Sequence, residues 1–107
     1  MAIELRTKRP DARLKQIVEA LKKYGESHPA SQISVYRQNS VSVRVRIVSP
    51  EFNGVGRAQR DEELWKVLEE LPEEVVAEIS VLLLLTPREV EKSFANLDFD
   101  NPIPSEL

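Results

Sequence analysis

The stretch "IVSPEFNGVGRAQRDEELWKVLEEL", Ile47 to Leu71, joins the end of an apolar strand to a glycine-bearing loop and an amphipathic helix. The apolar positions after the loop fall on one helical face: Leu64, Trp65, Val67, Leu68 and Leu71. Pro72 ends this helix because its ring cannot continue a helix interior. The stretch predicts a strand–loop–helix unit. It leaves three roles open for the loop, which could bind a metal, bind a phosphate or simply start the helix.

Alternating and helical patterns on both sides of this stretch complete the predicted fold. They predict a helix over about 11–24, a hairpin with strands near 33–35 and 41–47, and a third strand over about 78–86. The capping-box pattern "TPRE" at 86–89 predicts a last helix. The order α-β-β-α-β-α predicts a single-domain α+β sandwich, in which a three-stranded mixed sheet has its helices packed on one face.

The same patterns predict the domain boundaries. Residues 1–10 are expected to be a flexible basic N-terminal segment, and residues 11–97 are expected to form the single α+β domain. Residues 98–107 are acidic and contain two prolines, so we expect a loosely held tail. The chain has no apolar run long enough to cross a bilayer and no signal-peptide core, which predicts a cytoplasmic protein with no membrane partner.

Composition limits the chemistry that the chain can perform. With no cysteine and one histidine, His28, a single chain cannot build a thiolate site, a zinc site or an iron site with two histidines. No ordered acidic loop of the calcium-binding type is present. The serines have no identifiable base partner. We therefore expect no metal, no cofactor and no enzyme activity.

Several residues around the loop match a known family. Val48, Ser49, Phe52, Gly54 and Arg60 resemble the signature of BolA-like proteins, in which a Val-Ser pair and Phe-x-Gly precede an Arg-His pair that opens a helix. Later, "LLLLTPREV" at 82–90 resembles the closing strand of that family and the threonine that starts its last helix. The resemblance covers about residues 33–90. It implies a fold related to the type II KH fold and a tendency to bind partner proteins.

The metal-associated positions of that family differ in this chain. In BolA-like proteins, the histidine after the arginine and another in the closing strand are associated with iron–sulfur cluster sharing with a monothiol glutaredoxin. The corresponding residues are Asp61 and, approximately, Leu83. A leucine cannot ligate iron. The resemblance therefore implies binding without a metal, unless a glutaredoxin partner supplies most of the cluster ligands.

The loop and the start of the next helix form the first candidate site. Gly54 and Gly56 would let a phosphate approach the free N–H groups of the helix, with Arg57 and Arg60 adding positive charge. Asp61 and the two glutamates after it would repel that phosphate. The alternative interpretation is that the glycines shape a turn and the acids stabilise the helix start.

The second candidate site is the exposed face of the sheet. Tyr36, Arg44 and Arg46 are expected to project together, either to bind a nucleic acid or to protect the sheet from aggregation. Leu82 and Leu84 are expected on the same side. There they either form an interface with a partner protein or a second copy of the chain, or are covered by the tail residues Leu97, Phe99 and Ile103.

Two functions follow from these patterns. The first is a non-enzymatic BolA-like binding or regulatory module that acts through protein–protein contact or self-association without a metal site. The alternative is a KH-related protein that binds RNA or DNA, through weak contacts of the helix N-terminus and the basic sheet face.

Overall fold

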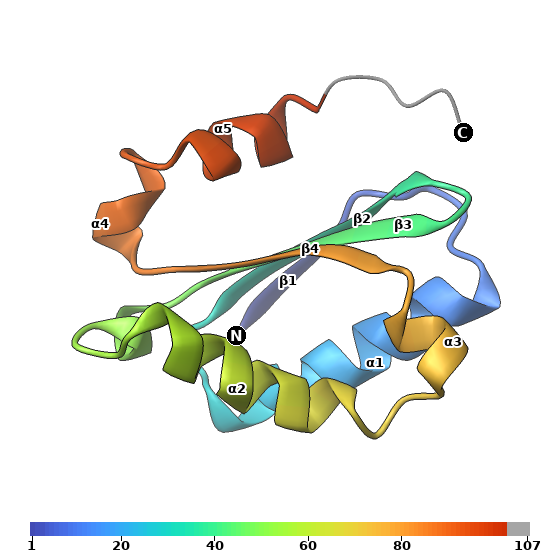
Figure 1. Ribbon diagram of the computed structural model, residues 1–107, viewed down its shortest axis with the longest axis horizontal. Coiled ribbons are helices and arrows are strands. Elements are labelled where there is room, and N and C mark those ends of the chain that lie inside the picture. Colours follow the sequence, from blue (N-terminus) through green and yellow to red (C-terminus); the bar gives the residue numbers. More distant parts are fainter. Residues whose placement is uncertain (103–107) are drawn as a thin grey trace.

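The computed structural model describes residues 1–102 and contains a four-stranded mixed sheet with strand order β1-β2-β3-β4 (Figure 1). The strands are β1 (Ala2–Leu5), β2 (Gln32–Asn39), β3 (Ser42–Val48) and β4 (Ile79–Leu85). β2 and β3 form an antiparallel hairpin, whereas β1 pairs with β2, and β4 with β3, in parallel. The predicted α+β class is confirmed, but the prediction of three strands is wrong.

The additional strand, β1, forms one edge of the sheet. Ile3 pairs with Ile33 and Leu5 with Val35, and the Arg6 N–H continues the ladder to the Val35 carbonyl at 3.0 Å. Ile3 and Leu5 pack against the core while their neighbours stay exposed. A short strand in a charged segment is stabilised by this edge pairing, so residues 2–5 are not the flexible segment predicted for residues 1–10.

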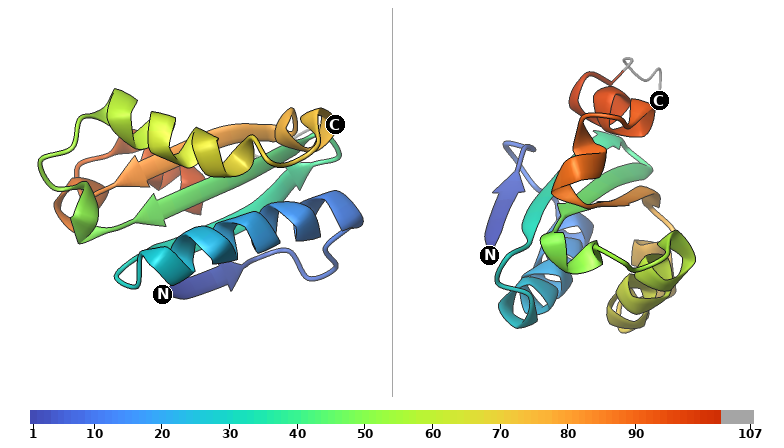
Figure 2. Two further views of the ribbon diagram at one scale, coloured as in Figure 1. Left: turned by 90° about the horizontal axis from the view of Figure 1, so that it is seen from below. Right: turned by 90° about the vertical axis from the view of Figure 1, so that its left-hand side faces the viewer.

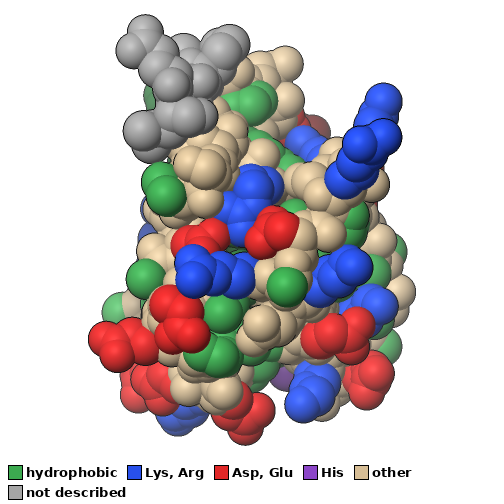
Figure 3. Space-filling model, turned by 90° about the vertical axis from the view of Figure 1, so that its right-hand side faces the viewer, with side chains coloured by type: hydrophobic (Ala, Val, Ile, Leu, Met, Phe, Trp, Pro, Cys, Tyr) green, Lys and Arg blue, Asp and Glu red, His purple; other side chains and the backbone are tan. Residues whose placement is uncertain are grey.

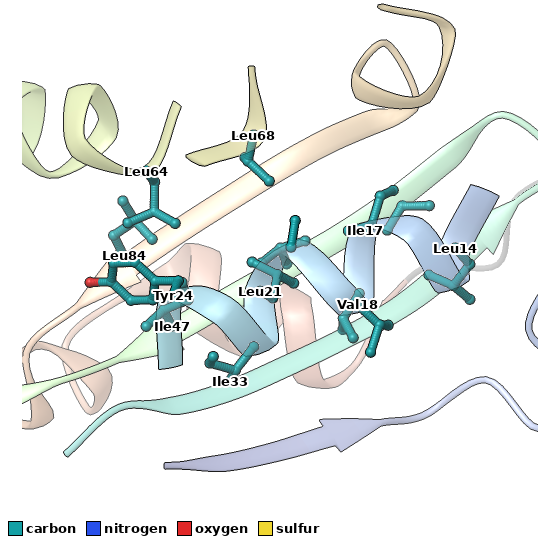
Figure 4. Packing of buried hydrophobic residues seen from close by; sticks show 14 of the residues in the cluster. Leu14, Ile17, Val18, Leu21, Tyr24, Ile33, Ile47, Leu64, Leu68 and Leu84 are labelled. Atoms are coloured by element: carbon teal, nitrogen blue, oxygen red, sulfur yellow. The ribbon is translucent and has the colours of Figure 1, made fainter. Parts of the chain in front are cut away.

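One face of the sheet is covered by α1 (Ala12–Ser27), α2 (Arg57–Leu68) and α3 (Glu73–Val76), as Figures 1 and 2 show. The two longer helices bury apolar stripes against the odd-numbered residues of β2 and β3. Figure 4 shows this core from close by. Its fully buried residues include Leu14, Ile17, Leu21, Ile33, Val35, Val43, Val45, Ile47, Leu64 and Leu68.

A second helical layer lies on the opposite face of the sheet (Figures 1 and 2). It consists of α4 (Pro87–Val90) and α5 (Phe94–Asp100). The prediction that all helices pack on one face is therefore wrong, because Phe99 of α5 is buried on the other face. Residues 98–100 of the predicted loose tail form the end of α5, whereas residues 103–107 lie outside the described residues.

The strand–loop–helix unit is present as β3, a short 3-10 helix η1 (Pro50–Phe52) and α2. The Ser49 hydroxyl accepts the Glu51 N–H at 3.1 Å and so starts η1. The predicted capping box of α4 is also present, because the Thr86 hydroxyl accepts the Glu89 N–H and the Glu89 carboxylate accepts the Thr86 N–H. Among the described residues, no helix is both long and apolar enough to cross a bilayer.

Candidate interaction surface

The basic strand face, formed by Tyr36, Arg44 and Arg46, is covered by α5. Arg44 Nη1 donates to Asp98 Oδ2 at 3.1 Å. Arg46 Nη1 donates to Asp100 Oδ1 at 2.9 Å. It also donates to the Asn96 side chain at 2.7 Å. These charge-assisted hydrogen bonds occupy the guanidiniums that were predicted to contact a nucleic acid.

Phe99 is the apolar centre of this contact. Its ring lies edge-on to Tyr36 with centroids 4.9 Å apart, and the Tyr36 hydroxyl donates to the Phe99 carbonyl at 2.7 Å. The guanidinium carbons of Arg46 and Arg6 lie 4.8 Å and 5.3 Å from the centre of the Phe99 ring. Cation–π contacts of this kind add to the burial of the ring. The predicted nucleic-acid face is thus an intramolecular interface.

Arg60 is a buried structural residue in this fold. Its Nε donates to the Val55 carbonyl at 2.9 Å and its Nη2 to the Phe52 carbonyl at 3.1 Å. Nη1 donates to the Leu84 carbonyl at 3.1 Å and to Glu89 Oε1 at 2.6 Å. One guanidinium therefore joins the loop, β4 and α4, and it is not available for an external anion.

Glu89 is held ionised by this arrangement. The Thr86 N–H and the Arg60 guanidinium lower the pKa of Glu89 to about 2. A carboxyl whose pKa is lower in the folded than in the unfolded state stabilises the fold above its unfolded pKa, and this stabilisation is lost as the pH falls towards the folded pKa. The contribution of Glu89 is therefore present at neutral pH and disappears between about pH 4.5 and pH 2.

We expect Glu89→Gln to lower the free energy of unfolding by about 1–2 kcal/mol at pH 7, after allowance for solvent at this partly exposed pair. The difference from the unmodified chain should shrink as the pH falls and approach zero below about pH 2, because Glu89 is then protonated and both chains are uncharged at this position. Urea unfolding measured across this pH range tests the prediction. Glu91→Gln, an exposed neighbour without an ion pair to any residue within 1–102, serves as the control. A difference in the free energy of unfolding between Glu89→Gln and the unmodified chain that stays constant across the pH range would contradict the prediction.

The remaining loop residues play separate roles. Gly54 has φ +76°, a left-handed conformation that favours glycine, and Gly56 is the N-cap of α2. Both glycines are exposed, as are Arg57 and Asp61. Of the three residues proposed as an anion site with Arg60, the structure brings Gly56 and Arg57 together at the helix start. It assigns Gly54 to a turn.

Leu82 and Leu84 lie on the opposite face of the sheet from the one predicted. The register pairs Leu82 with Val45 and Leu84 with Ile47, so both point towards α1 and α2. Leu84 belongs to the hydrophobic core, and Leu82 packs against it. They do not share a surface with Tyr36. The register shift between β3 and β4 near Val43 alters the facing that alternation alone would predict.

Charged residues elsewhere are also paired within the chain. Arg37 contacts Asp11 at 2.8 Å and Glu78 at 2.8 Å, and Arg13 also contacts Glu78. Figure 3 views the side of the molecule that carries the turn between β2 and β3. Lys and Arg side chains there lie beside Asp and Glu side chains rather than in a patch of one sign.

The largest apolar side chains left exposed within residues 1–102 are concentrated on α5. Phe94 is 89% exposed and Leu97 is 61% exposed. Together with Val90 of α4 they line a cleft of about 420 Å³, and we call these three residues the α4–α5 surface. One of the two predicted alternatives was that Leu97, Phe99 and Ile103 cover Leu82 and Leu84. Of these, Phe99 covers the basic strand face, and Ile103 lies outside the described residues.

Sequence reasoning missed the α4–α5 surface, although its signal was present. The spacing of Phe94 and Leu97 places them on one side of a helix, and Phe99 falls on another side. A short helix with two apolar sides is typical of a segment that packs inwards through one side and presents the other.

Within residues 1–102, no group of three or more His, Asp or Glu side chains is placed to hold a metal ion. The ring of His28 stacks on Tyr24, with centroids 4.0 Å apart. Asp61 and Leu83, which the predicted resemblance places at the histidine positions of BolA-like proteins, carry a carboxylate and an aliphatic side chain. The residues present therefore do not fit an iron–sulfur cluster.

Comparison of the chain with protein-family models, with curated proteins and with solved structures gave no match in any of the three. The resemblance to BolA-like proteins therefore stays a prediction.

Proposed function

We propose that the chain is a non-enzymatic, BolA-like binding module that contacts a partner protein through the α4–α5 surface, without a metal site. The observation that carries this proposal is the exposure of Phe94 and Leu97 on a helix whose other side is anchored by Phe99. Exposed apolar side chains grouped beside a cleft are typical of protein-binding surfaces. Aromatic side chains are also enriched among residues that dominate binding energy.

The alternative function, nucleic-acid binding, has less support. Of its four arginines, Arg44, Arg46 and Arg60 donate hydrogen bonds to groups of the chain itself. A phosphate would have to replace Asp98, Asp100 or Glu89, which are already charged partners at short distance. Only Arg57 stays exposed, so the predicted row of phosphate contacts is reduced to one residue.

The proposed function is tested by replacing Phe94 with the photocrosslinker benzoylphenylalanine in the purified chain. Irradiation in a lysate of the source organism should give a specific protein adduct from position 94. The same group at Val41, which is 55% exposed at the β2–β3 turn, should give none. Adducts from both positions, or from neither, would count against the proposal.

The partner recovered in this way permits a quantitative measurement. We expect the double variant Phe94→Ser, Leu97→Ser to raise the Kd by at least about tenfold, because two apolar anchors are lost. Val41→Ser should leave the Kd unchanged, since this residue is also apolar and exposed but does not line the cleft beside Phe94 and Leu97. Isothermal titration calorimetry with the purified partner measures both. An equal Kd for all three chains would show that the α4–α5 surface is not the binding site.

A further inference from the structure

A cleft lined by three cations adjoins the α4–α5 surface. Arg57 and Arg88 line this cleft of about 280 Å³ with Lys92, Ser93 and Glu89. Lys92 and Ser93 also line the larger cleft beside Phe94 and Leu97. The two clefts therefore share Lys92 and Ser93, and the apolar surface borders a cationic one.

The charge of the second cleft is not neutralised within residues 1–102. Arg57, Arg88 and Lys92 make no ion pair with any described residue, whereas Arg44, Arg46 and Arg60 each do. The one acid in the lining, Glu89, already accepts hydrogen bonds from Arg60 at 2.6 Å and from the Thr86 N–H at 2.8 Å. Its charge is therefore offset by Arg60, and the cleft keeps a net positive charge.

We propose that this combined surface binds a short acidic segment of a partner protein. Carboxylates of the segment would lie over Arg57, Arg88 and Lys92, and an apolar side chain would pack against Phe94 and Leu97. This inference rests on the proposed function and adds the chemistry of the partner. Complementary charge beside an apolar anchor is the usual basis of specificity at such an interface.

The surroundings favour an acidic peptide over a nucleic acid. Exposed acids flank the cations, with Asp61 beside Arg57 in an adjoining pocket and Glu91 next to Lys92 in the larger cleft. A polyphosphate carries a negative charge at every residue and would meet these acids as well as the cations, whereas a peptide can place carboxylates over the cations and uncharged side chains beside the acids.

The test is an NMR titration of the full, nitrogen-15-labelled chain with three probes. The first is a synthetic peptide of about twelve residues made of Glu, Leu and Phe, a length typical of a peptide that docks in a groove. The second has Gln in place of every Glu, and the third is oligodeoxythymidylate of equal length. We expect the acidic peptide to shift the amide signals of Arg57, Ser93, Phe94 and Leu97, and the Gln peptide to bind at least several-fold more weakly.

Variants of the cations complete the test. Arg88→Gln with Lys92→Gln should weaken binding of the acidic peptide about four- to twenty-five-fold, at about two- to fivefold for each exposed ion pair. Lys15→Gln with Lys23→Gln, which removes the same charge from α1, should change it less than twofold. Equal binding of the two peptides would overturn the inference while leaving the crosslinking result for the proposed function intact. No shift with either peptide would also overturn it, as would tighter binding of the oligonucleotide at the same residues.

Discussion

Arg60→Ala is expected to lower the free energy of unfolding by about 3–5 kcal/mol, because it removes a buried guanidinium that satisfies three carbonyl groups and pairs with Glu89. Arg60 is 5% exposed and its guanidinium donates to three carbonyls and to Glu89. Alanine would leave these acceptors without their donor. It would also remove the contact of the guanidinium with the Phe52 ring, whose centre lies 5.4 Å away. Urea unfolding followed by circular dichroism measures the loss.

The structure offers a matched control three residues earlier in the same helix. Arg57 is exposed and makes no ion pair with a described residue, so Arg57→Ala should change the free energy of unfolding by less than about 0.5 kcal/mol. Arg60→Lys should fall between the two, because an ammonium keeps the charge but cannot reach all four acceptors in the geometry of the guanidinium. Equal losses for Arg60→Ala and Arg57→Ala would show that the buried network does not stabilise the fold.

The sequence predicted the position of Arg60 in the fold but not its bonding partners. The strand–loop–helix unit was predictable because its signals are local: the alternation of β3, the Ser-Pro turn and the apolar stripe of α2. Arg60 was placed correctly at the start of that helix. Its partners Leu84 and Glu89 lie 24 and 29 residues away, so their proximity depends on how β4 and α4 pack. No local pattern contains that information, and the residue was read as a candidate anion ligand.

The sequence also could not predict which side chains of β4 point towards the core, and the reason is different. Its segment "VLLLL" is apolar at every position, so it lacks the alternation that identifies the buried face of a strand. The hairpin strands do alternate, and the structure places Val43, Val45 and Ile47 in the core as that pattern implies. β1 was missed because four residues with two apolar positions carry too weak a signal in a charged segment.

The covered sheet face reflects long-range pairing of charges. Arg44 and Arg46 alternate with buried valines, which correctly indicates that they project from the other side of the sheet. Their partners, Asp98 and Asp100, follow 54 residues later in a segment whose acids and prolines are typical of a loose tail. Composition could not distinguish a solvated tail from one that is held by two arginines and a buried phenylalanine.

Phe99→Ala is the second substitution with a large expected effect. The Phe99 ring is 1% exposed and is the main apolar contact between α5 and the sheet. Truncating a buried phenylalanine costs about 3–5 kcal/mol where the site cannot collapse. We expect a loss of about 3 kcal/mol, because α5 can separate from the sheet while the core on the other face stays intact. Hydrogen exchange of the amides of α5 should accelerate more than that of β3.

The control for this prediction lies in the same helix. Phe94→Ala removes an equal volume from a side chain that is 89% exposed, so it should cost less than about 0.5 kcal/mol and leave the hydrogen exchange of α5 unchanged.

Separation of α5 would also release Arg44 and Arg46 from Asp98 and Asp100. Phe99→Ala, but not Phe94→Ala, should then bind single-stranded oligonucleotides more tightly than the unmodified chain, with an affinity that falls as salt rises. If the two variants are equally stable and equally protected from exchange, Phe99 does not hold α5 on the sheet. If only the oligonucleotide affinity fails to rise, α5 is held by Phe99 but does not shield a nucleic-acid site.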